Sequence, residues 1–123
     1  MAWRRKKGSA SRFSGRPQKK RGEMNSTERW YYENHLLPKV ASGEVERIEY
    51  EAIRFELGKG STYLPDFYVF FTDGHAELHE TKGFWREDDR VKIKVAATRY
   101  SEFRWIGITI SGKKIKKLEE FNA

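Results

Sequence analysis

Residues 63–83, YLPDFYVFFTDGHAELHETKG, decide the fold of this chain. Stretches rich in aromatic and apolar residues, 63–71 and 76–82, flank Asp73-Gly74, a dipeptide typical of tight turns, so the segment predicts a β-hairpin. Pro65 has no N–H and suits the position where the chain enters a sheet. The first strand is strongly apolar, which indicates that the sheet is buried.

The second strand of this hairpin sorts its side chains onto two faces. Its two-residue period places Leu78, Glu80 and Lys82 on one face and Glu77, His79 and Thr81 on the other. Asp66 stands seven residues before the turn and Glu80 six after it, so both are expected at the same end of the hairpin. Two carboxylates and an ammonium group should therefore converge there.

The convergence of these three charged groups indicates the type of reaction that the site supports. Two close carboxylates repel each other unless a proton or a hard cation such as Mg²⁺ neutralises them. A metal held by carboxylates activates water and stabilises charge on a pentacovalent phosphate, while a neighbouring lysine positions the nucleophile or shares that charge. Asp66, Glu80 and Lys82 thus predict metal-dependent phosphodiester hydrolysis.

Helices and further strands are predicted around the hairpin. Asn25 and Glu28 have the spacing of a capping box, so a first helix begins near residue 26, and either Pro38 or Ser42-Gly43 ends it. Strands are predicted at 45–50, 53–57 and 103–110, and a second helix at 87–100. This order predicts an α/β or α+β fold with a mixed central sheet flanked by helices.

The chain is predicted to form one domain, residues 25–123, behind a basic arm, residues 1–24. It has no cysteine, which excludes disulfides and thiolate zinc sites and suits the cytoplasm. No apolar run approaches the roughly 20 residues of a membrane span. We therefore expect no membrane association.

The net positive charge of the protein comes entirely from the arm. Residues 1–24 carry nine Lys or Arg against one acid, whereas residues 25–123 carry 16 basic and 17 acidic side chains. This composition predicts disorder in the free protein. Lys19, Lys20 and Arg21 are candidates for binding DNA phosphates, and a solubilising tail or a cloning remnant is the alternative.

Pro65-Asp66 followed by Glu80-Thr81-Lys82 resembles the PD-(D/E)xK nuclease superfamily, which includes restriction enzymes, Holliday junction resolvases and repair nucleases. The longer string YLPDF…HETKGFWREDDRVKIKVAA is similar to small, mostly phage-encoded members of it. The resemblance covers roughly residues 25–110, and its specificity comes from the apolar strand, the turn, the second strand and the helix around the short motif. It implies a restriction-endonuclease-like core.

The resemblance also implies roles for individual residues. Asp66, Glu80 and the backbone carbonyl of Thr81 would bind Mg²⁺ or Mn²⁺, and Lys82 would be the catalytic lysine. Glu28 matches an acidic residue that many members add from the first helix, although a helix cap explains it equally well. Lys94 corresponds by position to a polar residue that some members use near the scissile phosphate.

The second helix carries further candidates for DNA binding, namely Arg86, Arg90, Lys92 and Lys94. Arg90 and Lys94 are four residues apart and share a side that can meet a phosphate, whereas an ordinary solvated face is the alternative.

The histidines and one aromatic pair are assigned structural roles. His35, His75 and His79 lack the spacing of a zinc site or a general-base cluster. Phe84-Trp85 can stack on a splayed base, but packing is the preferred interpretation.

The leading functional hypothesis is a metal-dependent DNA endonuclease, structure-selective and Holliday junction resolvase-like, that acts in phage DNA processing. Two symmetric cuts across a junction need two active sites, which a homodimer supplies. A nicking, restriction-type or transposase-type nuclease would share every catalytic residue. A non-catalytic DNA-binding protein on the same fold and a structural phage protein are the alternatives from other classes.

Overall fold

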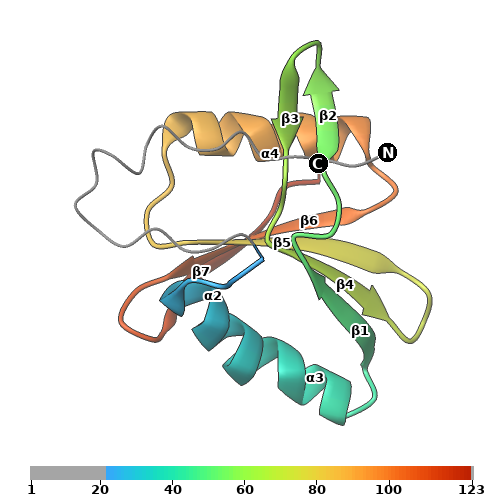
Figure 1. Cartoon of the computed structure of the whole chain (residues 1–123), viewed down its shortest axis with the longest axis vertical. Coiled ribbons are helices and arrows are strands. Elements are labelled where there is room, and N and C mark those ends of the chain that lie inside the picture. Colours follow the sequence, from blue (N-terminus) through green and yellow to red (C-terminus); the bar gives the residue numbers. More distant parts are fainter. Residues whose placement is uncertain (1–21, 123) are drawn as a thin grey trace.

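The hairpin predicted from residues 63–83 lies at the centre of a five-stranded sheet (Figure 1). The computed structural model describes residues 22–122. Strands β4 (Phe67–Phe71) and β5 (Ala76–Lys82) pair antiparallel, with Phe67 opposite His79. Gly74 adopts φ 97° in the turn between them, a conformation that favours glycine.

Three more strands complete this sheet in the order β1-β4-β5-β6-β7. Strand β1 (Val45–Tyr50) pairs antiparallel with β4, and β6 (Arg104–Ile110) pairs parallel with β5. Strand β7 (Ile115–Glu120) pairs antiparallel with β6 at the edge. The sheet is therefore mixed, as predicted.

The first helical stretch packs on one face of the sheet. It runs without a break through α2 (Ser26–Tyr31), the π-helical segment η1 (Tyr32–Leu36) and α3 (Leu37–Ala41). Pro38 does not end it, because the proline lies in the first turn of α3, where its missing N–H is tolerated. The helix stops at Ser42-Gly43 instead, where Gly43 adopts φ 86°.

The opposite face is covered by α4 (Glu87–Arg99) and by a two-stranded sheet of β2 (Phe55–Gly58) and β3 (Ser61–Tyr63). Figure 1 shows α4 and α2–α3 on opposite sides of the central strands. Each face has its own apolar cluster. The α2–α3 side buries Tyr31, Leu36, Val45, Phe67, Val69, Phe71, Ile106, Ile108 and Ile110, and the α4 side buries Phe55, Leu78, Ile93, Ala96, Ala97 and Trp105.

Two details differ from the sequence prediction. The stretch 63–71 is not one strand, since the chain leaves β3 after Tyr63 and enters the central sheet only at Phe67, on either side of Pro65. The charged segment 115–120 is a strand, whose lysines and glutamates suit an exposed edge. None of the helices within residues 22–122 has the length and apolar character needed to cross a bilayer.

Candidate active site

Asp66 and Glu80 meet at the end of the β4–β5 hairpin, as predicted. Asp66 immediately precedes β4 and Glu80 lies within β5, and both side chains are buried. The backbone N–H of Asp66 donates to Glu80 Oε1 over 3.1 Å. The hairpin therefore fixes the two carboxylates in neighbouring positions without contributions from any distant loop.

Lys82 joins Glu80 on the α4 face of the sheet. Its Nζ lies 3.2 Å from Glu80 Oε2 and 3.8 Å from Asp89 Oδ1 in the first turn of α4. Burial alone would lower the pKa of Lys82, but the charges of Glu80 and Asp89 outweigh it, and the net shift is upward. Lys82 is therefore a cation held beside the two carboxylates.

The carboxylates carry more negative charge than this lysine offsets. Burial, followed by the charges of Glu80 and Glu28, raises the pKa of Asp66 well above its ordinary value. Burial also raises the pKa of Glu80, against the opposing effect of Lys82. An additional cation at this site would relieve both groups.

Glu28 lies next to Asp66 and also caps α2. Its Oε1 accepts from the backbone N–H of Asn25 at 2.9 Å and from the hydroxyl of Tyr50 at 2.7 Å, and the capping box with Asn25 is present. A side-chain hydrogen bond with Glu28 is one of the causes that raise the pKa of Asp66. Glu28 thus has a structural role and a place beside the expected ligands.

Thr81 contacts Asp66 through two donors. Its backbone N–H and its hydroxyl lie 2.8 and 3.0 Å from Asp66 Oδ2. Asp66 is therefore held from the side of the sheet that faces α2, where Glu28 and Thr81 lie.

A small pocket of about 190 Å³ opens beside Glu80 on the other face. Its lining residues are Tyr63, Leu64, Glu80, Lys82, Trp85, Asp89 and Lys92. The sequence did not single out Tyr63 or Asp89 for the site. Tyr63 reaches the pocket through packing of a separate sheet, β2–β3, which no local pattern records.

The basic residues of α4 divide between two surfaces. Lys92 lines the pocket with Glu80 and Lys82, whereas Lys94 lines a separate groove with Glu119 and Phe121. Arg90 is paired with a residue of that groove, since its Nη2 lies 2.7 Å from Glu119 Oε2. Of the helical residues proposed for DNA binding, the structure thus brings Lys92 into the pocket and places Arg90 and Lys94 elsewhere.

The remaining candidate residues belong to the start of α4 or to the arm. Arg86 is exposed at the start of α4, and Phe84 is 78% exposed. Trp85 is packed, as predicted: its Nε1 donates to Thr109 Oγ1 at 2.9 Å, and its ring lies so close to Gly107 that a Cβ there would clash. Lys19, Lys20, Arg21 and the predicted disorder of the arm lie outside the described residues.

The donor set suits a hard divalent cation. Carboxylate oxygens are the ligands that Mg²⁺ prefers, and it usually binds through one or two carboxylates while it retains several waters. Within residues 22–122 no three His, Asp or Glu side chains form a ready-made metal cluster. The expected set needs only Asp66, Glu80 and a backbone carbonyl, and both carboxyls have raised pKa values, chiefly because burial disfavours their charged forms, which a cation would stabilise.

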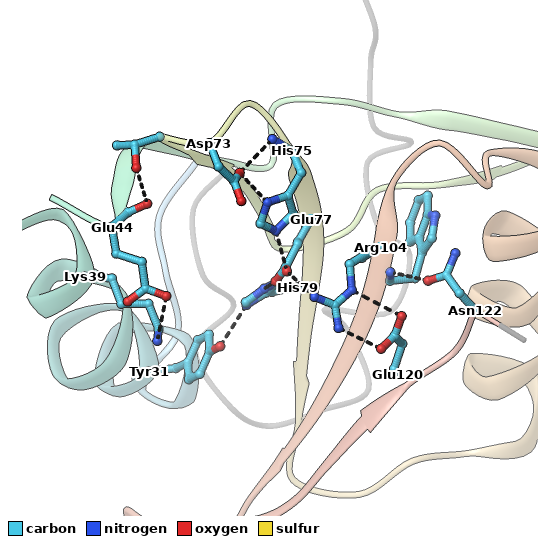
Figure 2. Close-up of polar contacts among 12 residues, drawn as sticks. Tyr31, Lys39, Glu44, Asp73, His75, Glu77, His79, Arg104, Glu120 and Asn122 are labelled. Carbon is cyan, nitrogen blue, oxygen red and sulfur yellow. Dashed lines mark hydrogen bonds and ion pairs between the residues drawn. The ribbon is translucent and has the colours of Figure 1, made fainter.

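The opposite face of β5 carries a second polar cluster, shown in Figure 2. Glu77 accepts from His79 Nε2 at 2.8 Å, and His79 Nδ1 lies 2.7 Å from the hydroxyl of Tyr31. His75 Nε2 and Arg104 Nη1 lie 2.9 and 3.1 Å from the other oxygen of Glu77. Every one of these groups has a partner, which supports the structural role predicted for His75 and His79.

The partners also define the protonation states in this cluster. Burial alone would raise the pKa of Glu77, but hydrogen bonds from His79 and His75 and the charge of Arg104 lower it. Burial lowers the pKa of His79. A neutral His79 beside an ionised Glu77 carries its proton on Nε2, so Nδ1 accepts from Tyr31.

Comparisons with protein-family models, with curated proteins and with solved structures found no match for this chain.

Proposed function

We propose that this protein is a divalent-metal-dependent endodeoxyribonuclease of the PD-(D/E)xK superfamily. The observation that carries the proposal is the meeting of Asp66 and Glu80 in one buried site, with Lys82 3.2 Å from Glu80 and the pKa of Asp66 raised well above its ordinary value. Glu80 lines a pocket together with Lys82, and titratable groups with strongly perturbed pKa values beside a pocket are candidates for catalysis.

Each residue has a distinct role in the proposed reaction. Asp66 and Glu80 would hold Mg²⁺ or Mn²⁺, with the backbone carbonyl of Thr81 as the third protein ligand. Such an ion would supply a water of lowered pKa and positive charge next to the phosphate. Lys82, which is paired with Glu80, would place its ammonium group on the attacking water or on a phosphate oxygen.

The remaining groups position these residues. Thr81 orients Asp66 through the two hydrogen bonds to Oδ2, and Glu28 contributes negative charge beside it. Lys92 at the mouth of the pocket is the basic residue of α4 best placed to contact a DNA phosphate. The arm, residues 1–24, would add affinity that does not depend on sequence.

Branched DNA, of the Holliday junction kind, is the proposed substrate, and a homodimer the proposed active form. Their support is the family resemblance of the Pro65-Asp66 and Glu80-Thr81-Lys82 motif. A dimer with twofold symmetry would place two such sites for paired cuts. A nicking, restriction-type or transposase-type nuclease would use the same residues on a different substrate.

The test is cleavage of a substrate panel with Mg²⁺ and with Mn²⁺. The panel contains a four-way junction, a flap, a splayed arm, a linear duplex and a single strand. We expect metal-dependent cleavage by the full chain, its loss in Asp66→Ala with DNA binding retained, and normal cleavage by the control Asp88→Asn. Asp88 is an exposed acid of α4 outside the pocket.

Two outcomes would contradict the proposal. Undiminished cleavage by Asp66→Ala would show that Asp66 is not part of the catalytic site. A wild-type protein that binds DNA but cleaves no substrate with either metal would instead be a non-catalytic DNA-binding protein.

A further inference from the structure

The hydroxyl of Tyr63 is buried and lacks a well-formed hydrogen bond. Only two buried side-chain polar atoms within residues 22–122 have no partner, Arg54 Nε and this hydroxyl. Buried polar atoms are nearly always hydrogen-bonded, because removing them from water without a new partner is destabilising. An exception of this kind calls for a physical reason.

Packing explains the ring of Tyr63 but not its hydroxyl. The ring lies against Trp105, with the two centroids 6.1 Å apart, and belongs to the apolar cluster beneath α4. A phenylalanine would make the same ring contact without burying an unpaired oxygen. The fold alone therefore favours Phe at this position, and the tyrosine needs another explanation.

The hydroxyl lies at the Glu80 pocket. Tyr63 lines it together with Glu80, Lys82 and Asp89. The hydroxyl, which is a hydrogen-bond donor at neutral pH, interacts with the side chain of Glu80 but without the geometry of a formed hydrogen bond. The two oxygens of Glu80 are already engaged, Oε1 by the N–H of Asp66 and Oε2 by Lys82.

We propose that Tyr63 is a positioning residue for the divalent cation: its hydroxyl donates a hydrogen bond to a water molecule of the ion's hydration shell. This inference rests on the proposed function. Mg²⁺ dehydrates reluctantly and keeps several waters when carboxylates bind it. Groups that hydrogen-bond the ligands of a metal typically change its affinity by about 10-fold to 100-fold.

The experiment compares Tyr63→Phe with Tyr100→Phe in the full-length chain without DNA. Two quantities are measured, the melting temperature without metal and the affinity for Mn²⁺ by titration calorimetry. Tyr100 is the matched control because its hydroxyl donates to the backbone carbonyl of Glu56 at 2.7 Å, away from the pocket. Its loss should affect stability alone.

Tyr63→Phe is expected to melt at the wild-type temperature or above it and to bind Mn²⁺ at least about 10-fold more weakly. Tyr100→Phe is expected to melt lower and to bind Mn²⁺ normally. The different changes in melting temperature and in Mn²⁺ affinity distinguish a hydroxyl that helps to bind the ion from one that stabilises the fold.

Other outcomes overturn the inference. If the wild type binds Mn²⁺ and Tyr63→Phe binds it equally well, Tyr63 has no role toward the ion, while the nuclease proposal stands. A lower melting temperature of Tyr63→Phe with normal Mn²⁺ affinity shows that the hydroxyl is structural. If the wild type binds no Mn²⁺, the metal site itself fails and this inference fails with it.

Discussion

The two faces of β5 bury carboxylates in opposite ways. On the α2 face, Glu77 is surrounded by donors from His75, His79 and Arg104, and its pKa is lowered. At the other end of the same hairpin, Lys82 is paired with Glu80, and the pKa values of Asp66 and Glu80 are both raised, chiefly by burial. One strand thus carries an acid whose partners lower its pKa and, three residues on, an acid whose burial raises it.

This difference distinguishes a buried acid that stabilises the fold from buried acids that we propose for catalysis. A buried carboxylate whose oxygens all have donors stabilises the fold and specifies one arrangement of its neighbours. A buried pair with raised pKa values is stabilised by a proton or by a bound cation, so it is a candidate site for a ligand that supplies positive charge. We therefore assign Glu77 to the fold and propose Asp66 with Glu80 for the chemistry.

Lys82→Met should produce the largest effect on function. We expect the cleavage rate to fall by roughly 100-fold to 1,000-fold, because the cation that stabilises charge in the transition state is lost. Mn²⁺ affinity should be retained or increased, since Lys82 no longer competes for Glu80. Single-turnover cleavage and metal titration measure the two effects.

Lys59→Met, in the turn between β2 and β3, is the control for that change and should cleave normally. Equal cleavage by Lys82→Met and Lys59→Met would show that Lys82 has no catalytic role.

Glu77→Ala should produce the largest effect on stability. It leaves the buried His79 without its acceptor and Arg104 without one of its carboxylate partners, so the free energy of unfolding should fall by about 3 kcal/mol. Mn²⁺ affinity of the folded fraction should stay at the wild-type value. Urea denaturation and metal titration test both expectations.

Glu46→Ala removes an exposed acid from β1 and should leave stability nearly unchanged. If Glu77→Ala behaves like this control, the α2-face cluster does not stabilise the fold as described.

Tyr31→Phe should have a smaller effect of the same kind. It removes the donor to His79 Nδ1 inside the core, and we expect a loss of about 1 kcal/mol in the free energy of unfolding. Cleavage by the folded protein should not change. A stability equal to that of the wild type would show that the hydrogen bond between Tyr31 and His79 contributes nothing.

The dependence of stability on pH provides a further test of the structural role of Glu77. The pKa of Glu77 is lower in the folded protein than in the unfolded chain, so its contribution is present above the unfolded value, near 4.3, and is lost as the pH falls through the folded value. The stability difference between the wild type and Glu77→Gln should therefore be largest near about pH 5 to 6, shrink below about pH 4, and also decrease at higher pH as His75, whose pKa Glu77 raises, loses its proton. Urea denaturation from pH 3 to pH 7 measures it, and a constant difference would contradict the assignment.

The sequence predicted the parts of the molecule that depend on short-range patterns. The Asp73-Gly74 turn, the period of residues 76–82 and the capping box of Asn25 and Glu28 follow from rules that act within a few residues, and all three are present. The meeting of Asp66 with Glu80 also follows, because one hairpin carries both.

The parts that the sequence did not reveal depend on contacts between distant segments. Tyr63 reaches the pocket because the β2–β3 sheet packs against α4. The contact of Asp89 with Lys82 is closer in sequence, but it depends on the path of residues 83–86, which carry no regular pattern. Helix periodicity gave no reason to prefer Lys92 over Lys94 at the site. Strand β7 was missed because its Lys and Glu residues obscure the alternation of a strand.

Locating a bound Mn²⁺ ion by its anomalous scattering in crystals of the full chain tests the central claim most directly. The claim predicts an ion in direct contact with carboxylate oxygens of both Asp66 and Glu80 and no ion at Glu77. An ion held by Glu77 and its neighbouring histidines, or crystals with no ion at Asp66 and Glu80 under saturating Mn²⁺, would contradict it.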